Sequence, residues 1–362
     1  MSFKCGLVGL PNVGKSTIFN NLTNSTVSAD NFPFCTIKPN IGRITVSDSR
    51  LNVISKLVNS NRIIPTYIEL VDIAGLVKGA YKGEGLGNKF LNCIRQTDLV
   101  IHVVRGFKNN EIVHIHGQVN PIEDIEIINL ELILSDLEIC KNRIKKLQKS
   151  HLLNKNTLDM EIKILYRCLD FLKKNKFLKL LNLTQEEINV ISYLKFITLK
   201  PMMYIVNMSK NANNNACLKK VYKLSKQDNS NVLLVYMDVI NNNYIRNSEK
   251  RVLNSCELNL DESGLSAIPN SGYALLNLKT FFTVGKKEVR AWTTTSDIEI
   301  YKSVKCIHTD LSKGFIRAQV IAYSDFIKYE GEKNVKKFGK MRMEGKNYYI
   351  NDGDIINVLY KV

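Results

Sequence analysis

The sequence predicts an α/β protein with a mainly parallel sheet, an inserted pair of antiparallel helices and a small α+β domain at its C-terminal end. Three observations lead to this prediction. Short apolar segments alternate with helical segments, which is typical of a parallel sheet covered on both faces. Within 125–200, apolar residues instead recur at coiled-coil spacing. From residue 278 onward, short β-rich segments alternate with glycine-containing turns.

Five short apolar segments are candidates for buried strands of the main sheet. The first is Phe3–Val8, which ends at Gly9 and precedes a glycine-rich loop and a helix from about Lys15 to Thr23. The other four segments are Tyr67–Ile73, Leu99–Val104, Met202–Val206 and Val232–Tyr236. We therefore assign 1–124 and 201–277 to one sheet domain.

Residues 125–200 predict a helical arm inserted into this domain. Two series of apolar residues recur every three or four positions, and a polar segment, His151–Thr157, separates them. Such spacing predicts two antiparallel helices that pack as a coiled coil and project from the sheet; the alternative is that both lie flat on it. The two series are Leu130, Ile133, Leu137, Cys140, Ile144 and Leu147, then Leu158, Ile162, Leu165, Leu169 and Leu172.

The charge of the chain favours a polyanionic partner. The 362 residues include 51 Lys and Arg against 34 Asp and Glu, a formal charge of +17 that no single segment accounts for. Nucleic acid, the ribosome and an acidic membrane all fit such a charge, and compositional drift toward Lys, Asn and Ile is the alternative. Because we find neither a secretory signal pattern nor an apolar stretch of about 20 residues, we expect a cytoplasmic protein.

Residues Gly9–Ser16 match the phosphate-loop pattern of a glycine, four residues and then Gly-Lys-Ser. The glycines let backbone N–H groups approach phosphate oxygens, and the following helix adds its positive N-terminal end. Lys15 would reach the β and γ oxygens as a catalytic group, and Ser16 would offer its hydroxyl to Mg²⁺. The predicted nucleotide ligands in this segment are Asn12, Val13, Gly14, Lys15, Ser16 and Thr17.

Two further motifs supply what a bound nucleoside triphosphate needs besides this loop. Asp72, at the end of a predicted strand, is a candidate magnesium ligand acting through water, and Gly75 can present its N–H to the γ-phosphate. Thr36 lies between these motifs and the phosphate loop. It is placed to contact magnesium while triphosphate is bound and to release it after hydrolysis.

These motifs resemble the YchF subfamily of Obg-like P-loop NTPases. The resemblance implies a G domain, an inserted coiled-coil arm at 125–200 and a C-terminal TGS domain of the β-grasp type at 278–362. It also implies a preference for ATP over GTP and binding to the 70S ribosome or its large subunit through rRNA. We expect a monomer with no membrane and no specific DNA partner. The similar stretches are Gly6–Leu22, Asn31–Pro39, Val71–Ala80, Gly83–Asn88, Lys286–Trp292 and Ile307–Gln319.

The base-recognition segment departs from guanine-specific relatives, which have an Asp at its last position. Here the segment reads Asn207-Met208-Ser209-Lys210. A lysine only donates hydrogen bonds, so it cannot replace the acceptor that guanine requires; the alternative is that Lys210 is solvated and never touches the base. Asn207 can hydrogen-bond adenine and Met208 can pack on a purine. The later segment Tyr236-Met237-Asp238 also departs from the small residues usual there, so relaxed base selectivity is the alternative to ATP.

Hydrolysis needs a positioned water as well as neutralised phosphate charge. Leu76, which follows the Asp-x-x-Gly motif, can neither donate nor accept a hydrogen bond. His114 is the candidate for this role, and the resemblance also places a histidine there; the alternative is a surface histidine such as His116. Asn12 can help to hold K⁺ near the phosphates, as in potassium-dependent relatives, or merely cap the loop.

Three functions are compatible with these motifs. The first is a slow ATPase whose nucleotide state controls ribosome binding. The second is a scaffold that binds the ribosome or a partner regardless of nucleotide, and the third is a GTPase of ribosome assembly. Basic side chains that can contact RNA, or simply form a solvated surface, are Lys286, Lys287, Arg290, Lys313, Arg317, Lys336, Lys337, Lys340 and Arg342, and in the arm Lys141, Arg143, Lys145, Lys146 and Lys149.

Overall fold

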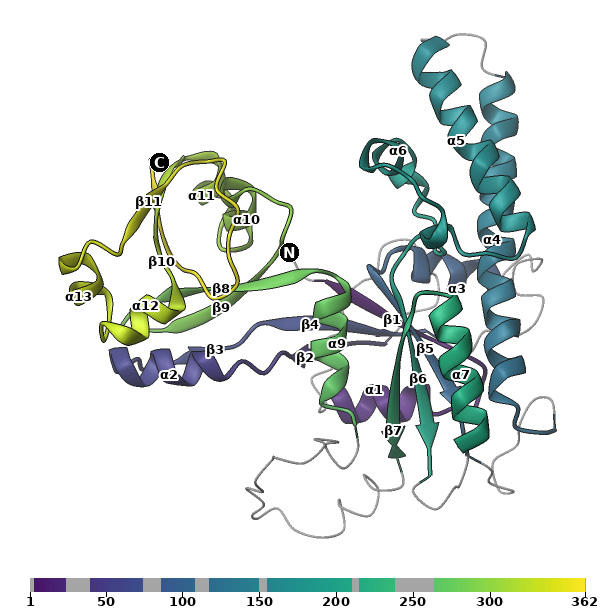
Figure 1. The fold of residues 1–362 in the computed structure, drawn as a ribbon, viewed down its shortest axis with the longest axis horizontal. Coiled ribbons are helices and arrows are strands. Elements are labelled where there is room, and N and C mark those ends of the chain that lie inside the picture. Colours follow the sequence, from purple (N-terminus) through teal and green to yellow (C-terminus); the bar gives the residue numbers. More distant parts are fainter. Residues whose placement is uncertain are drawn as a thin grey trace. The chain divides into compact units, whose positions relative to one another are not determined.

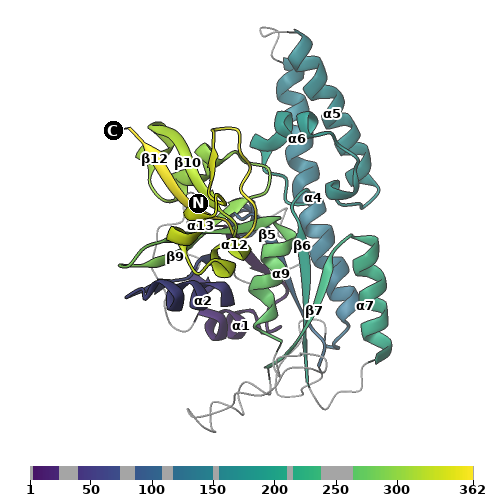
Figure 2. The ribbon, with the colours of Figure 1, turned by 60° about the vertical axis from the view of Figure 1, so that its left-hand side comes forward.

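The computed structural model shown in Figure 1 and Figure 2 describes residues 3–23, 40–73, 86–107, 117–149, 155–209, 215–237 and 264–361. The chain forms two compact units. The N-terminal unit consists of Lys4–Gly42 and Leu70–Ile268. The C-terminal unit consists of Met1–Phe3, Arg43–Glu69 and Pro269–Val362.

A six-stranded sheet organises the N-terminal unit, and it contains the five predicted strands. Strands β1, β5, β6 and β7 pair in parallel, with His102 of β5 opposite both Val8 and Tyr204. All residues of β5 and β6 are buried, as expected for central strands covered on both faces. In sheet order the strands are β2 (Asn40–Thr45), β4 (Tyr67–Asp72), β1 (Lys4–Val8), β5 (Leu99–Arg105), β6 (Met202–Met208) and β7 (Asn231–Tyr236).

Helices cover this sheet. The amphipathic helix α4 packs against β5 and against α7, and α7 in turn packs against β7 (Figure 1). Helix α1 follows the glycine-rich loop directly and buries Ile18 and Phe19. The helices of this unit are α1 (Lys15–Thr23), α3 (Leu86–Arg95), α4 (Pro121–Lys149) and α7 (Asn215–Gln227). Helix α9 (Ala267–Leu275) begins at the end of this unit and belongs mostly to the C-terminal unit.

The predicted helical arm is present. Helix α4 runs for 29 residues, and its second half packs along α5 (Lys155–Lys173) as an antiparallel pair that projects beyond the sheet (Figures 1 and 2). Most of the predicted seam is buried, but Leu130 is 39% exposed, so the α4–α5 seam begins after it. The chain returns to β6 through η2 (Leu178–Leu180), α6 (Gln185–Ile191) and η3 (Ser192–Leu194). The buried seam residues are Ile133, Cys140, Ile144, Leu147, Leu165, Leu169 and Leu172.

A buried ion pair holds the base of the arm. Asp136 of α4 is fully buried, and its Oδ1 accepts a hydrogen bond from Arg95 Nη1 of α3 at 2.7 Å. Its Oδ2 accepts from both the backbone N–H (2.7 Å) and the hydroxyl (2.8 Å) of Thr198. Arg95 Nη2 donates to Ser135 Oγ at 2.6 Å. Because its charge is paired and both of its oxygens are hydrogen-bonded, Asp136 ties α3, α4 and the segment before β6 together.

A second six-stranded sheet forms the C-terminal unit, and its topology confirms the predicted α+β domain. Strands β8 and β9 form an antiparallel hairpin, and β12 pairs antiparallel to β10 but parallel to β8, with Ile355 opposite Phe282. The strand order is β11 (Arg342–Glu344), β10 (Phe315–Ile321), β12 (Ile355–Tyr360), β8 (Leu278–Val284), β9 (Val289–Thr295) and β3 (Ile63–Ile64). Its short helices are α10 (Ile300–Ser303), η4 (Val304–Cys306), α11 (Thr309–Lys313), α12 (Tyr323–Lys328) and α13 (Glu332–Lys337).

The segment Arg43–Glu69 belongs to the C-terminal unit, although the sequence analysis placed it with the first sheet. Its helix α2 (Ser49–Val58) buries Leu51 and Ile54 in the same apolar cluster as Phe282, and β3 pairs with β9 and forms one edge of the second sheet. The compact units therefore divide the chain differently from the predicted boundary at residue 278. The stabilising contacts join residues more than 200 positions apart, so no local pattern indicates them.

We expect the ion pair at the base of the arm to be a main determinant of stability. Asp136→Ala would leave Arg95 buried and unpaired, which should lower the free energy of unfolding by about 3–5 kcal/mol. The exposed Asp170 lies 3.7 Å from Lys173, so Asp170→Ala is a control that should change it by less than about 1 kcal/mol. Urea unfolding followed by circular dichroism measures both values. Equal effects of the two substitutions would contradict this account.

Candidate nucleotide-binding site

The loop between β1 and α1 has the backbone geometry that its glycines predicted. Gly9, Asn12 and Gly14 all have positive φ, at 147°, 61° and 100°. A Cβ atom at Gly9 would lie 2.4 Å from the carbonyl oxygen of Val103, and one at Gly14 would lie 2.6 Å from Asn207 Nδ2. Neither position therefore accepts a larger residue without a shift, and the loop backbone stays open to an anion at the N-terminus of α1.

Lys15 lies across this loop. Its side chain is buried, and Nζ donates hydrogen bonds to the carbonyl oxygens of Gly9 (3.1 Å) and Leu10 (2.7 Å). Burial lowers the pKa of Lys15 from 10.5 to about 8, while the negative charge of Asp72 opposes this shift. An ammonium held among carbonyl groups gains a stronger partner when a phosphate approaches, because the hydrogen bond then joins two opposite charges.

Ser16 and Asp72 meet at the carboxyl ends of β1 and β4. Ser16 Oγ donates a hydrogen bond to Asp72 Oδ2 at 2.9 Å. Asp72 Oδ1 is buried and accepts no hydrogen bond from any residue that the structure describes. A hydroxyl and a carboxylate oxygen without a partner suit Mg²⁺, which prefers oxygen ligands. The described residues contain no group of three His, Cys, Asp or Glu side chains that could hold a metal ion.

Asn207, at the end of β6, holds the phosphate loop in place. Its Nδ2 donates a hydrogen bond to the carbonyl oxygen of Val13 at 3.1 Å, and its own backbone oxygen accepts one from Gly106 N–H at 2.8 Å. Its Oδ1 is buried and has no partner among the described residues. The sequence motif predicts contact of Asn207 with the base alone and gives no sign that one N–H of the amide fixes the loop.

The structure places the other predicted site residues as follows. Met208 is buried next to Gly106, where a Cβ would lie 2.4 Å from its sulfur atom, and Met237 is also buried. Thr17 is exposed in the first turn of α1, and Val13 is buried within the loop. Thr36, Gly75 and His114 lie outside the described residues, as do Leu76, Lys210 and Asp238.

His102 is a neighbour of this site that the sequence analysis missed. It lies on β5, is 1% exposed and has its ring centroid 5.4 Å from that of Tyr204. Burial and, to a smaller extent, the charge of Lys15 lower its pKa to about 3, so the imidazole is neutral. The only signal in the sequence is one polar residue within an apolar strand, which is too weak to indicate a role.

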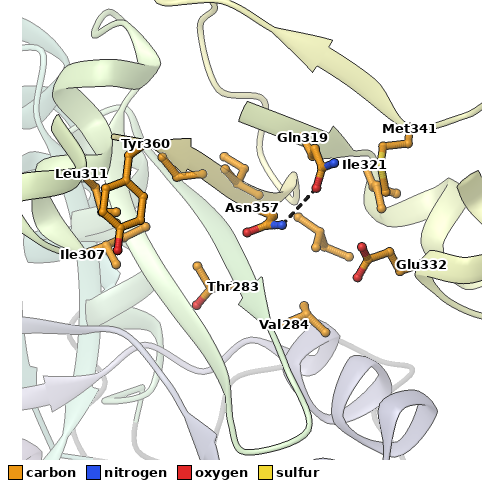
Figure 3. A pocket seen from close by; sticks show the side chains of 13 residues that line it. Thr283, Val284, Ile307, Leu311, Gln319, Ile321, Glu332, Met341, Asn357 and Tyr360 are labelled. Atoms are coloured by element: carbon orange, nitrogen blue, oxygen red, sulfur yellow. Dashed lines mark hydrogen bonds between the residues drawn. The ribbon is translucent and has the colours of Figure 1, made fainter. Parts of the chain in front are cut away.

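A separate cavity of about 340 Å³ lies within the C-terminal unit, between β8 and β12 where these strands diverge (Figure 3). Thr283 and Val284 line one side, and Asn357, whose Nδ2 donates to Gln319 Oε1 at 3.0 Å, lines the other. None of the predicted nucleotide or magnesium ligands lines this cavity. The candidate site is therefore the phosphate loop and not this cavity.

The loop, the Ser16–Asp72 pair and the parallel sheet together define a P-loop NTPase of the G-domain class. Residues 4–136 match the family model described as 50S ribosome-binding GTPase. Residues 278–361 match the model of the YchF GTPase C-terminal domain, described as a protein of unknown function (DUF933).

The chain belongs to the YchF family. It is 55% identical to the ribosome-binding ATPase YchF of Buchnera aphidicola subsp. Baizongia pistaciae and 48% identical to that of Escherichia coli O157:H7, in both cases over all of each chain. Its structure is similar to that of the Schizosaccharomyces pombe YchF GTPase, with 31% identity and a TM-score of 0.83 over 99% of this chain and 98% of the other.

We expect Gly14→Ala to weaken binding of a magnesium–nucleoside triphosphate by at least about tenfold, or about 1.4 kcal/mol. The added Cβ would clash with Asn207 Nδ2 and would strain the backbone at a φ of 100°. The control is Gly345→Ala, because a Cβ there meets nothing within 4 Å. Titration with a fluorescent ATP analogue measures both affinities, and equal binding by the two variants would show that the loop geometry does not determine affinity.

Proposed function

We propose that this chain is a ribosome-associated ATPase that slowly hydrolyses ATP to ADP and phosphate while binding the 70S ribosome or its large subunit. The arrangement of Lys15, Ser16 and Asp72 around an open phosphate loop is the observation that carries the nucleotide part. The ribosome part rests on relatives that match the whole chain and are named ribosome-binding ATPases. The basic composition agrees with an RNA-rich partner.

In this proposal the chain binds and orients the triphosphate rather than reacting with it. Lys15 would release the carbonyls of Gly9 and Leu10 and donate to β and γ oxygens, and the loop N–H groups would hold the same phosphates. Ser16 and Asp72 would hold Mg²⁺, which when bound neutralises phosphate charge. Thr36 remains the proposed magnesium contact of the triphosphate-bound state, and Gly75 remains the proposed contact of the γ-phosphate. K⁺ at Asn12 remains a prediction.

Base chemistry supports ATP over GTP. Asn207 Oδ1 is a buried acceptor without a partner among the described residues, and it can accept from the amino group that adenine carries at C6. Guanine has a carbonyl oxygen at C6 instead, and its N–H groups need an acceptor. Lys210, at the last position of the segment, cannot provide that acceptor because an ammonium only donates hydrogen bonds. Met208 would pack on the purine.

Two alternatives have specific support. Leu76 stands where many related NTPases have a water-positioning glutamine, which favours a scaffold that binds its partner regardless of nucleotide. The description 50S ribosome-binding GTPase favours a GTPase of ribosome assembly. We propose a monomer located in the cytoplasm. Among the described residues, no helix is long and apolar enough to cross a membrane.

Co-sedimentation with purified ribosomes in the presence of ATP analogue, ADP or no nucleotide tests the main proposal. We expect binding to differ between these states, and ATP to bind more tightly than GTP in parallel titrations. Lys15→Ala should lose the nucleotide dependence, since its ammonium is the main cationic side chain of the loop. Equal sedimentation of the wild-type protein in all three states would support the scaffold, and tighter GTP binding would support the GTPase.

His114 is the proposed water-positioning residue. His114→Ala should slow single-turnover ATP hydrolysis by about 10²-fold or more while leaving ATP affinity unchanged, because imidazole acts only on the attacking water. His116→Ala serves as the control for a nearby histidine. If the two variants hydrolyse ATP at the same rate, another group positions the water.

A further inference from the structure

Helix α13 of the C-terminal unit, labelled in Figure 2, is followed directly by an exposed aromatic residue, Phe338. Phe338 is 60% exposed, the largest fraction among the exposed large apolar side chains of the described residues. One face of its ring lies on Tyr329, which follows α12, with ring centroids 4.9 Å apart and planes inclined by 26°. The exposed fraction shows that much of the Phe338 side chain stays open to solvent despite this contact. This stacked pair presents a flat aromatic surface to solvent.

The fold holds the Phe338 ring in place, although the ring is not part of the neighbouring apolar core cluster. Val335 anchors α13 because it is fully buried in the cluster that contains Phe326, and Tyr329 packs at the edge of that cluster. The chain leaves α13 through a fixed turn, in which Gly339 has a φ of 67° and Lys340 N–H donates to the carbonyl oxygen of Val335 at 3.0 Å. The ring of Phe338 is therefore presented by a rigid support rather than by a loose loop.

The surrounding charge is positive. Residues 328–340 contain five lysines against two glutamates, Glu330 and Glu332. All five lysines are exposed, and none forms a salt bridge with a described residue. The ammonium of Lys328 also lies 5.5 Å from the centre of the Tyr329 ring. The lysines are Lys328, Lys333, Lys336, Lys337 and Lys340.

An aromatic ring on a rigid support among unpaired cations matches the way proteins hold single-stranded nucleic acid. Bases stack on the ring, and lysines follow the phosphates. A paired helix would use the lysines alone, because its bases are not accessible for stacking. We propose that Phe338 stacks on an unpaired RNA base and that the surrounding lysines contact the adjoining phosphates. This inference rests on the proposed ribosome binding, which makes RNA the polyanion.

The test compares single-stranded and duplex RNA of equal length by fluorescence anisotropy at several salt concentrations. Phe338→Ala should weaken binding of the single strand by about 5- to 150-fold and leave duplex binding unchanged. Phe338→Tyr should retain the affinity. Lys337→Ala should reduce the slope of log affinity against log salt by about 0.7, whereas Phe338→Ala should not change it.

The matched control is Tyr349→Ala, which removes another half-exposed aromatic side chain from the same unit. Loss of Phe338 or Tyr349 should leave the thermal unfolding curve unchanged. Equal single-strand affinity of wild type and Phe338→Ala would overturn the proposal, and so would an equal loss with duplex RNA. A Phe338→Ala protein that loses ribosome binding but keeps its affinity for single strands would indicate a protein contact, which also overturns it. A wild-type protein that binds single strands through Phe338 but not ribosomes would disprove only the proposed function.

Discussion

The parallel pairing of β1, β5 and β6 is the constraint on which the site depends. Because parallel neighbours end at the same edge of a sheet, the residues that follow these strands lie close together at that edge. There β1 opens into the phosphate loop, and β6 ends near Asn207, which bonds to the loop at Val13. The Ser16–Asp72 hydrogen bond places the end of β4 there as well. A shift of register by one residue would move these side chains to the other face of the sheet.

Burial at this edge controls its electrostatics. Lys15 is held by neutral carbonyl groups, and the negative charge of Asp72 only partly offsets the effect of its burial. His102, buried on the neighbouring strand, stays neutral, so it adds no competing positive charge beneath the loop. The buried ammonium of Lys15 is poorly solvated, and Asp72 Oδ1 has no hydrogen-bond partner among the described residues. Both groups would therefore gain favourable interactions when phosphate and a metal ion bind.

Much of the fold follows from local patterns in the sequence. The buried strands of the first sheet, the phosphate loop and the paired helices of the arm are recognisable because each has its own spacing of apolar residues or glycines. Local patterns do not show that Arg43–Glu69 belongs to the C-terminal unit, because α2 and β3 are stabilised by contacts with residues beyond 280. Likewise, no motif indicates that Asp136 pairs with Arg95 or that one N–H of Asn207 belongs to the loop, since both depend on tertiary packing.

Helix α4 has a mechanical consequence. It begins at Pro121, contains no glycine and no further proline, and is one continuous helix from the sheet, where it packs on β5, to the end of the arm. At 1.5 Å per residue its 29 residues extend about 43 Å. Because only its first half is held by the sheet, the helix acts as a lever whose pivot lies near Asp136. Beyond this pivot, the segment 137–149 extends about 20 Å, so a tilt of about 5° displaces the tip by about 2 Å.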